Sequence, residues 1–517
     1  MTASPATVLV VGAGPTGLAA AITLARAGAS VRIVDLADAA TTLSKALVLW
    51  RRSLLTLDPA VPFERFLEHG SAVRGARFYE DGKLGPVLDM PRGDHELPPG
   101  VLVPQSDTEQ ILGETLESLG VRVERSTRLV QFSPHADGVR CELEGPHGRE
   151  TLEVGWLLGC DGAHSTVRHG LGVSFPGETV SRRWILGDIE IAVEDGINPH
   201  RPECEEERTL EPGWMHLDGG RAGAAAIFPM NRGRFRVIFD GGPAADDAPP
   251  REVTETEIAG LLHARTRLQW RIVRSHWLAE FRINERQVER YVHGRVLLCG
   301  DAAHVHSPAG GQGMNTGLQD AVNAAWKVAL AARGEADPAL VESYHAERHP
   351  VGAKVLAMSG RMLRASMISN PLLARLRGFG MLMAFGIPAV RRRLAASLTE
   401  DDIDYADGPL AEGGHGAGHV LPDVAIDRNG ARRPATDLLR GASGVLLLGQ
   451  EADAANFRST TWLASRTTHR LGEAESSLAA AIGLEPKEAA LVRPDGVIAA
   501  IGGPDALGQW CAAAGIR

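Results

Sequence analysis

The sequence contains few cysteines, no excess of positive charge and no long hydrophobic run. Five cysteines occur among 517 residues, none in a C-x-x-C pair, and their odd number argues against a disulfide framework or a zinc site. The net charge of −10 argues against a general nucleic-acid-binding protein. The longest apolar candidate, residues 379–390, is interrupted by Gly and Pro and is too short to cross a bilayer.

The N-terminus also lacks the features of a signal peptide. Its first apolar stretch, Val8–Val11, is too short for one and continues directly into glycines. These absences predict a protein of the reducing cytoplasm, with no metal site, no nucleic-acid partner and no membrane span. With 44% apolar and 23% charged residues, the chain has the composition of a globular protein with a large core.

A strand–turn–helix–strand pattern occupies residues 7–35. The continuous apolar run Val8–Val11 predicts a strand buried on both faces, and Ala19–Ala27 predicts a helix that ends at Gly28. Val31–Val34 predicts the next strand, which ends at Asp35. This order is typical of an α/β unit.

The turn before this helix has the spacing G-x-G-x-x-G. Gly12 allows a tight turn, Gly14 lets the backbone approach a pyrophosphate, and Gly17 lets the helix pack closely on the strand. The helix N-terminus attracts phosphate charge, and Asp35 is placed to accept hydrogen bonds from an adenosine ribose. The pattern predicts dinucleotide binding but does not distinguish NAD from FAD.

Two later apolar strands each end in an acid beside a glycine. The stretch "WLLGCDG" (156–162) ends in Asp161 and is followed by Arg168, and the run 295–299 leads into Gly300 and Asp301. Five glycines lie within residues 299–317. Two strand-end acids so far apart are hard to explain in a simple NAD dehydrogenase.

The three motifs, in this order, resemble those of the class A flavoprotein aromatic monooxygenases. This family has the fold of p-hydroxybenzoate hydroxylase and includes polyketide and phenol hydroxylases. The resemblance covers about residues 7–360. It implies an α/β protein in which a Rossmann-type FAD-binding domain carries an inserted β-sheet substrate domain. Longer members add a small α/β, thioredoxin-like C-terminal domain, which we also expect here.

The resemblance implies the following division of the chain. The FAD-binding domain is expected at residues 1–75, 100–178 and 280–398, and the substrate-binding sheet domain at residues 76–99 and 179–279. The acidic, glycine-rich stretch 399–419 is a predicted linker to the thioredoxin-like domain, 420–517. That domain has no C-x-x-C and only Cys511, so we expect it to be structural or an oligomer contact, without thiol exchange.

The resemblance also implies cofactor contacts, residue by residue. The ADP half of FAD is implied to lie at Gly12, Gly14, Pro15, Thr16, Gly17 and Asp35. Gly300 and Asp301 are implied to bind the ribityl chain, with Gln105 nearby. Asp161 and Arg168 are implied to support both FAD and a transient NADPH or NADH. Where many relatives carry arginine this chain has Lys45, expected either to contact the pyrophosphate or flavin or to be a solvated surface residue.

A loop after the last acid suits a flat ring. Pro308 would stiffen the wall beside the isoalloxazine, and bare backbone at Gly310, Gly311 and Gly313 would let the ring lie against main chain. A helix predicted at Thr316–Ala329 would stabilise negative charge on reduced flavin through its N-terminal N–H groups. No catalytic side chain is identified beyond this flavin-supporting loop, which is represented by Pro308, Gly313, Met314 and Asn315. His304 and His306 are interpreted as loop-packing residues, since no third metal ligand is near.

Strands predicted at 183–193, 223–230 and 234–241 would form the substrate sheet. Since alternate residues of a strand face opposite sides, only some of them can reach a pocket. The candidates for substrate contact are Trp214, His216, Phe228, Met230, Arg236 and Arg282.

The remaining segments are assigned from their patterns. Residues 338–365 and 370–398 are predicted to be helical, the second packed on the core or forming a dimer face rather than lying on a membrane surface. In the C-terminal domain we predict strands at 444–450 and within 489–502, and a helix at 467–483. The protein is expected to be a monomer or a homodimer.

The resemblance implies an FAD-dependent monooxygenase that consumes NAD(P)H and O2. It would hydroxylate a small aromatic substrate, a polycyclic polyketide or a phenol, through a C4a-hydroperoxyflavin, since the difficult chemistry belongs to the cofactor. Two alternatives stay open. One is Baeyer–Villiger or epoxidising oxygen insertion on the same fold, and the other is a flavin-holding protein that binds a ligand without turnover.

Overall fold

The computed structural model describes most of the chain. It leaves out residues 1–6, 81–82, 91, 93–96, 194–209, 221–222, 231–232, 245–248, 267–269, 369, 412–415, 429–430 and 442. Cys204 and part of the predicted linker therefore lie outside the described residues. Within those described, no helix combines the length and apolar composition needed to span a membrane.

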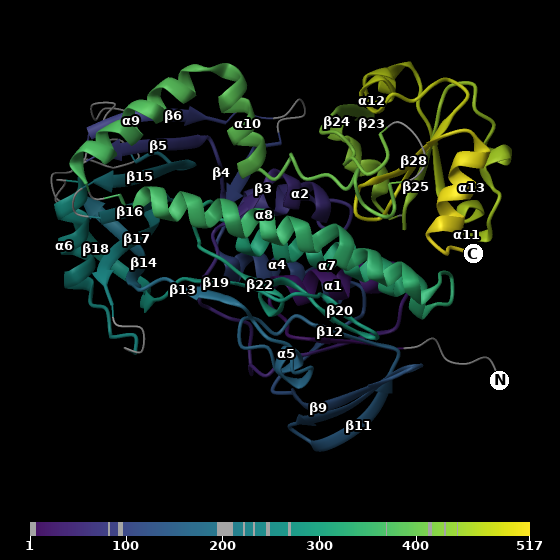
Figure 1. The fold of residues 1–517 in the computed structure, drawn as a ribbon, viewed down its shortest axis with the longest axis horizontal. Coiled ribbons are helices and arrows are strands. Elements are labelled where there is room, and N and C mark those ends of the chain that lie inside the picture. Colours follow the sequence, from purple (N-terminus) through teal and green to yellow (C-terminus); the bar gives the residue numbers. More distant parts are fainter. Residues whose placement is uncertain are drawn as a thin grey trace.

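A six-stranded sheet lies at the centre of the molecule (Figure 1). Its strand order is β20 (Val292–His293), β21 (Val296–Leu298), β12 (Trp156–Gly159), β1 (Val8–Val11), β2 (Val31–Val34) and β8 (Val123–Glu124). All neighbours are parallel except β20 and β21. The carboxyl ends of β1, β12 and β21 therefore lie side by side, which brings the three motifs together.

Helices cover this sheet. They are α1 (Pro15–Arg26), α4 (Gln105–Ser118) and α7 (Gly313–Ala332), and α1 packs against both of the others. The apolar faces of α1 and α7 join the strands in one core. The predicted helix at 316–329 is confirmed and begins three residues earlier, at Gly313.

Short elements complete this region. The small helices are α2 (Arg51–Leu57), α3 (Phe63–His69) and α5 (Thr166–Gly170). One antiparallel sheet contains β3 (Val48–Trp50), β7 (Gly100–Leu102) and β4 (Ser71–Ala72), and another contains β9 (Arg128–His135), β10 (Gly138–Gly145) and β11 (Gly148–Val154). A third contains β13 (Gly177–Thr179), β19 (Asn284–Gln287) and β22 (His304–Val305).

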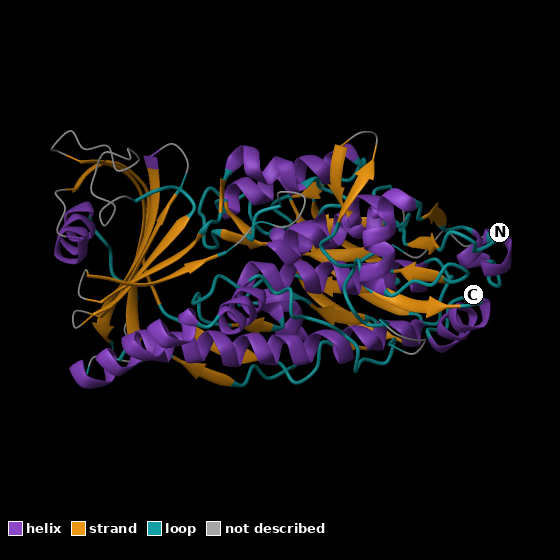
Figure 2. Ribbon diagram, turned by 90° about the horizontal axis from the view of Figure 1, so that it is seen from above, coloured by secondary structure: helices purple, strands orange, loops and turns teal. Residues whose placement is uncertain are grey.

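A seven-stranded sheet stands at the end of the molecule remote from the C-terminus, as Figures 1 and 2 show. Its order is β18 (Trp270–Phe281), β14 (Arg182–Val193), β17 (Arg234–Pro243), β16 (Gly223–Pro229), β15 (Trp214–Gly220), β5 (Gly75–Glu80) and β6 (Lys83–Asp89). The three strands predicted at 183–193, 223–230 and 234–241 are confirmed. Helix α6 (Glu255–Thr266) packs on one face.

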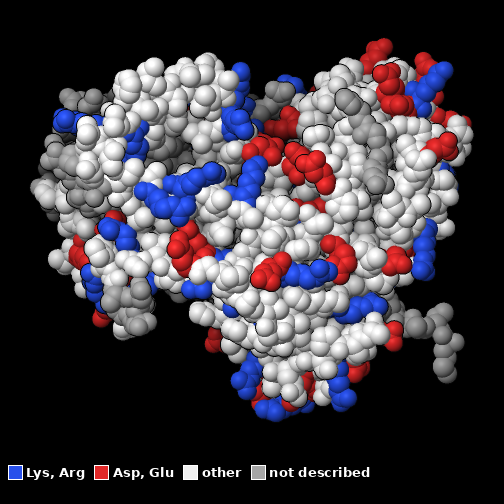
Figure 3. Space-filling view, in the orientation of Figure 1, with Lys and Arg blue, Asp and Glu red and all other residues white. Residues whose placement is uncertain are grey.

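Three helices follow α7. The long α8 (Glu342–Ser366) runs from beside the C-terminal domain to the seven-stranded sheet, and α9 (Pro371–Gly386) and α10 (Pro388–Leu398) form an arch over the β5–β6 edge (Figure 1). The helical predictions for 338–365 and 370–398 are confirmed. Acidic and basic side chains are interspersed over the face seen in Figure 3.

The C-terminal domain is built on a four-stranded sheet. Its order is β26 (Thr467–Arg470), β25 (Val445–Leu448), β27 (Ala489–Val492) and β28 (Ile498–Gly502). The remaining elements are β23 (Ala425–Arg428), β24 (Ala431–Pro434), α11 (Thr461–Ala464), α12 (Ser476–Ile482) and α13 (Pro504–Ala513). Cys511 is buried in the core of this domain.

The helix predicted at 467–483 is wrong in its first half. Thr467–Arg470 pairs in parallel with β25 as an edge strand, and only Ser476–Ile482 is helical. Two β-branched residues at the start and Gly472 behind them favour an edge strand that ends early. The predicted linker is also packed at its start, since Thr399, Glu400 and Tyr405 are buried.

Candidate active site

The first glycine turn has no room for side chains at two positions. Gly12 has φ of +99°, and a Cβ there would lie 2.4 Å from the Cys160 carbonyl oxygen. A Cβ on Gly17 would lie 1.9 Å from the carbonyl oxygen of Gly12. A Cβ on Gly14, by contrast, would meet nothing within 4 Å, and no side chain caps α1 there. The N-terminus of α1 therefore has no side-chain cap and leaves space beside Gly14, as a phosphate site requires.

Asp35 is tied to this turn. Its Oδ2 accepts a hydrogen bond from the backbone N–H of Ala13 at 2.5 Å, and its Oδ1 accepts one from Ala37 at 2.8 Å. The Arg125 guanidinium lies 3.7 Å from Oδ1. Asp35 thus holds the turn in shape while its carboxylate remains partly exposed at the end of β2.

Thr16 joins the first glycine turn to the last one. Its Oγ1 lies 2.7 Å from where a Cβ on Gly300 would be and 2.6 Å from that position on Gly317. Gly300 also has φ of +58°. Since Pro15 and Thr16 begin α1, the start of this helix lies against both the loop after β21 and the first turns of α7.

Asp161 is occupied by internal hydrogen bonds. Its Oδ1 accepts from the Ser165 hydroxyl at 2.6 Å and its Oδ2 from the Val167 N–H at 3.1 Å. The Ser165 Oγ in turn accepts from the Arg168 N–H at 2.9 Å and caps α5. Burial raises the pKa of Asp161, which these hydrogen bonds oppose. The acid stabilises the start of α5.

Arg168 connects the two strand-end loops. It is buried, and its guanidinium donates to the carbonyl oxygen of Ala163 at 2.8 Å and to that of Ala302 at 3.2 Å. Its Cζ lies 4.1 Å from the centre of the Phe175 ring. Arg168 therefore fixes the loop after β12 relative to the loop after β21.

Asp301 has a different environment. No protein donor among the described residues lies within hydrogen-bond distance of its carboxylate, which is exposed to solvent. Surrounding protein nevertheless limits its hydration and raises its pKa, while His304 and the Lys45 ammonium act in the opposite direction. Lys45 is also exposed, and its charge acts on this carboxylate.

The loop at 308–315 is held from behind. The Asn315 side chain accepts from the Trp50 N–H at 2.8 Å and donates to the carbonyl oxygens of Val48 at 2.9 Å and Gly311 at 2.8 Å. The Trp50 indole N–H donates to the Gly310 carbonyl at 2.8 Å. A Cβ on Gly311, where φ is +67°, would lie 3.3 Å from the Val48 side chain. These hydrogen bonds therefore hold the loop against β3.

Two other predicted residues of this loop differ in their exposure to solvent. Pro308 is exposed, whereas Met314 is 9% exposed and packs in the core. A Cβ on Gly313 would meet the His306 ring at 3.5 Å. Among residues 308–314, Pro308 is thus the exposed one.

Gln105 stabilises the segment that carries Lys45. Its Oε1 accepts from the Ala46 N–H at 2.9 Å, and its backbone N–H donates to the Ser44 hydroxyl at 2.8 Å. Its amide also donates to Glu109 at 2.9 Å. These contacts place Gln105 directly against residues 44–46.

Arg236 links the seven-stranded sheet to the segment that carries Lys45. It is 1% exposed, donates to the Lys45 carbonyl oxygen at 3.2 Å, and forms an ion pair with Asp188 at 3.0 Å. Arg234 pairs with the same carboxylate at 2.7 Å. The Arg236 Nε is buried and has no hydrogen-bond partner in the described structure. A donor is thus available at the boundary between the sheet and the loop.

The register of the sheet changes the set of wall residues. Phe228 pairs with Arg236, so Phe228 and Met230 lie on the face toward the loop. On β15 that face carries Met215 and Leu217, which pack with Trp50 in one apolar layer. His216 pairs with Ile227, which packs on the opposite face against α6. The structure therefore moves the candidate wall from Trp214 and His216 to Met215 and Leu217.

The two displaced residues form a separate group. Trp214 lies beneath the Arg77 guanidinium, 4.6 Å from its ring centre, and the Nδ1 of His216 is 2.9 Å from the Tyr79 hydroxyl. Burial lowers the pKa of His216 to about 3. Arg282 is half-buried just after β18 and makes further contacts within the protein. None of these three side chains is in the apolar layer next to the loop.

Several residues of the site were missed in the sequence. Asp320 lies under the last glycine loop, where its Oδ2 is 2.6 Å from the His304 Nε2. Asp320, Asn323 and Lys327 are all buried on α7. Three polar residues at spacings of three and four within an otherwise apolar helix are the signal that could have revealed them.

The described residues fit a bound FAD. The uncapped start of α1 beside Gly14, the partnerless carboxylate of Asp301 and the glycine-rich 308–313 loop lie along the carboxyl ends of three adjacent parallel strands. An extended dinucleotide needs a phosphate site, hydroxyl acceptors and a flat surface in that kind of arrangement.

Comparison with known proteins gives the family. Residues 5–359 match the family described as FAD binding domain, and residues 415–514 match the C-terminal domain of aromatic-ring hydroxylases. The chain is 34% identical to 12-dehydrotetracycline 5-monooxygenase/anhydrotetracycline 6-monooxygenase of Streptomyces rimosus, over 97% of this chain and 98% of that protein. It is 30% identical to pentachlorophenol 4-monooxygenase of Sphingobium chlorophenolicum, over 87% of this chain and 81% of that protein.

A solved structure agrees. CabE, an aromatic hydroxylase from angucycline biosynthesis, superposes with a TM-score of 0.78 at 31% identity, covering 99% of this chain and 100% of that one. The chain therefore belongs to the FAD-binding aromatic-ring hydroxylase family, and it is an FAD-dependent monooxygenase. The resemblance and the α/β fold predicted from the sequence are confirmed.

Proposed function

We propose that this enzyme hydroxylates a polycyclic aromatic compound of the polyketide type, with NADPH or NADH and O2 as co-substrates. The observation that carries the proposal is the apolar layer of Met215, Leu217 and Phe228, which packs with Trp50. The Trp50 indole in turn donates to the Gly310 carbonyl of the flavin-supporting loop. Methionine side chains adapt their shape and pack well against aromatic rings. Such a wall suits a broad, flat substrate.

The comparisons support the same class. The tetracycline relative matches over nearly the whole of both chains, whereas the phenol relative matches over less of each. CabE, which acts in angucycline biosynthesis by its description, is similar along its full length. We therefore place a polycyclic substrate ahead of a simple phenol.

We further propose roles for the cofactor-site residues. The α1 N-terminus at Gly14, Pro15 and Thr16 would bind the pyrophosphate, and Asp35 the adenosine ribose. Asp301 would accept hydrogen bonds from the ribityl hydroxyls, with Lys45 beside it. Bound FAD supplies the electron transfer and the activation of O2, and the protein orients the substrate and excludes water.

The remaining residues of the cofactor site would hold its loops in place. Arg168 and Asp161 would hold the loop after β12 in place, and Asn315 would hold the 308–313 backbone against the ring. Met314 anchors that loop in the core, and Gln105 positions the Lys45 segment. Arg236 would direct its partnerless Nε toward an oxygen substituent of the substrate.

The domain division at 75/76, 99/100, 178/179, 279/280 and 398–420 is proposed with this function. The seven-stranded sheet is drawn from residues 75–89 and 182–281, which supports those boundaries. A cytoplasmic location is part of the same proposal and is supported by the four described cysteines, which form no disulfide. The monomeric or homodimeric state stays a prediction.

The test is aerobic turnover of the purified full-length chain with FAD and NADPH or NADH. A tetracyclic or angucycline-type aromatic compound should stimulate NAD(P)H oxidation and yield a product heavier by one oxygen atom. A product with ring expansion would instead support Baeyer–Villiger insertion. Polycyclic aromatic compounds that neither stimulate NAD(P)H oxidation nor gain an oxygen atom would contradict the proposal.

A further inference from the structure

Four charged side chains are buried together where the C-terminal domain meets α7 and α8. Arg493 donates to both oxygens of Glu347, at 2.7 and 2.8 Å, and also contacts Asp495 at 2.5 Å. Lys327 donates to Glu347 at 2.8 Å. The side chains of Lys327 and Glu347 are 0% exposed, and those of Arg493 and Asp495 are 1% and 5% exposed.

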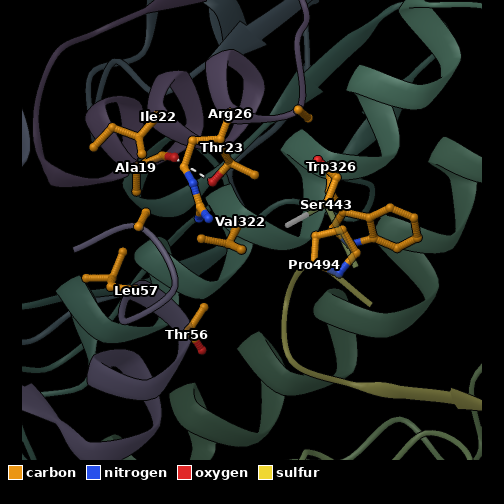
Figure 4. Close-up of a pocket in the computed structure, with 12 residues that line it drawn as sticks. Ala19, Ile22, Thr23, Arg26, Thr56, Leu57, Val322, Trp326, Ser443 and Pro494 are labelled. Atoms are coloured by element: carbon orange, nitrogen blue, oxygen red, sulfur yellow. Dashed lines mark hydrogen bonds between the residues drawn. The ribbon is translucent and has the colours of Figure 1, made fainter. Parts of the chain in front are cut away.

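Polar residues of α7 complete this cluster. The Asn323 amide donates to Glu347 at 2.7 Å and to Asp495 at 3.1 Å, and the Trp326 indole N–H donates to Asp495 at 3.2 Å. Figure 4 shows Trp326 beside Pro494, whose segment also borders a small cavity against α1. The turn 493–495 is therefore fixed to α7 by several charge-assisted hydrogen bonds.

Burial of so many charges is costly, which makes the arrangement informative. Burial opposes ionisation of Glu347, but the charges of Arg493 and Lys327 hold its pKa well below its usual range. A domain needs only apolar contacts to dock, and the Trp326 and Ala499 cluster already supplies them. The charged cluster adds a fixed orientation, because its hydrogen bonds tolerate little displacement.

A second buried cluster begins one residue further along α8. Arg348 donates to Asp320 at 2.7 Å, to the Tyr405 hydroxyl at 3.0 Å and to the Thr316 carbonyl at 3.1 Å. The other oxygen of Asp320 lies 2.6 Å from the His304 Nε2 and accepts from the Gly300 N–H at 3.3 Å. Asp320 and Arg348 are both 0% exposed.

The two clusters form one continuous path. They meet at Tyr405, whose hydroxyl accepts a hydrogen bond from Arg348 at 3.0 Å and whose ring centre lies 5.7 Å from the Arg493 Cζ. The path leads from the turn 493–495 to Gly300 and His304, the residues on either side of the loop that carries Asp301. It also runs along α7, whose first residues are Gly313–Asn315.

We propose that Arg493 is a positioning residue for the flavin reaction, through which the C-terminal domain holds the loop 299–315 in its FAD-binding conformation. The inference rests on the proposed FAD site and assigns a role to a domain that has no redox thiol pair. Arg493 acts through Tyr405, Arg348 and Asp320 and contacts no substrate or cofactor. If Arg493 served only to attach the C-terminal domain, its replacement would leave the conformation of the loop 299–315 unchanged.

The experiment compares three variants of the full-length chain. Arg493→Met removes the guanidinium group, Arg493→Lys keeps the positive charge, and Leu478→Ala is the matched control. Leu478 is 0% exposed in the second core of the C-terminal domain, away from α7, so its truncation loosens the domain without touching the path. Where Arg493→Met is recovered unfolded, Asp495→Asn, which keeps the size of the side chain, takes its place.

Two measurements report on the loop. Amide hydrogen exchange of residues 299–315 in FAD-free protein should become about tenfold faster in Arg493→Met, and the dissociation constant of FAD, followed by flavin fluorescence, should rise about tenfold. Arg493→Lys should lie between this variant and the wild type. Leu478→Ala should lower the melting temperature but leave both loop measurements as in the wild type.

Two outcomes would overturn the proposal. Exchange and FAD affinity within about twofold of the wild type in Arg493→Met would overturn it, as would equal changes in Leu478→Ala. A wild-type chain that binds no FAD would instead refute the proposed cofactor site. The two failures are therefore distinguishable.

Discussion

The loops after β12 and β21 look alike in sequence and differ in structure. Each has an acid next to a glycine at the end of a buried strand, Asp161 in one and Asp301 in the other. Asp161 accepts hydrogen bonds from Ser165 and Val167, so its carboxylate serves the protein. Asp301 has no donor within reach among the described residues and is exposed to solvent.

This difference indicates that Asp161 has a structural role, whereas the carboxylate of Asp301 is available to a ligand. A partnerless carboxylate surrounded by protein costs folding free energy, which a bound ligand can recover by supplying donors. An acid with two internal donors is already stabilised and gains less from a ligand. The same motif can therefore serve two purposes, and its hydrogen bonds show which one applies.

The largest expected effect is that of Asp301→Ala. Loss of charge-assisted hydrogen bonds to the ribityl hydroxyls should weaken FAD binding about a hundredfold, as followed by flavin fluorescence and visible absorbance. The FAD-free protein should be as stable as the wild type or more so, because no internal hydrogen bond is lost. Stoichiometric FAD in the purified variant would contradict the role assigned to Asp301.

Asp161→Ala should show the opposite pattern. Removing the acceptor of Ser165 and Val167 frees the start of α5 and should cost about 2 kcal/mol of stability in the FAD-free protein. FAD affinity should fall less than in Asp301→Ala. Thermal melting with and without FAD measures both effects, and an unchanged melting temperature of the FAD-free variant would remove the distinction between the two acids.

Arg168→Met tests the connection between the loops. The substitution keeps much of the packing on Phe175 but removes the hydrogen bonds to Ala163 and Ala302. We expect a loss of about 1.5 kcal/mol in stability and a moderate loss of FAD affinity, because both loops are loosened. Asp301→Ala serves as the control that affects affinity alone. A variant that loses affinity without stability would show that Arg168 contacts the cofactor directly.

Much of the fold could be predicted because its signals are local. The runs Val8–Val11 and Val296–Leu298 and the glycine spacing at Gly12, Gly14 and Gly17 depend on neighbours in the chain. The failures depend on distant partners. Thr467–Arg470 is a strand because β25 lies beside it, and a helical pattern could not reveal that partner.

The same limit applies to the site. His216 and Met215 are adjacent, and only the pairing of β15 with β16 decides which of them faces the loop. Asp161 and Asp301 could not be distinguished in sequence because Ser165 and Val167 act through the geometry of α5. Arg348 and Arg493 were missed since each acquires its partners only when α8 and the C-terminal domain meet α7.

A third acid, Glu400, extends the comparison of Asp161 with Asp301. Its replacement has the smallest expected effect. Glu400 is 2% exposed and shares hydrogen bonds with Gln319 and Thr316 on α7, so it has both burial and partners. Burial raises its pKa from the usual 4.5 to about 7, although the charge of Arg348 acts in the opposite direction. In the folded protein it therefore binds a proton that it has already lost in the unfolded chain between these two pH values.

Because the folded state binds more protons there, the contribution of Glu400 to stability falls as the pH rises from 4.5 to 7 and is constant above that. Glu400→Gln removes this loss. The variant should match the wild type near pH 5 and be about 1 kcal/mol more stable at pH 8, less than the full shift implies because the amide keeps only one acceptor oxygen. Melting temperatures across this range measure the difference. A variant that is less stable than the wild type at pH 8 would show that the partners of Glu400 outweigh its burial, as they do for Asp320, whose pKa is lowered by Arg348 and His304 despite burial.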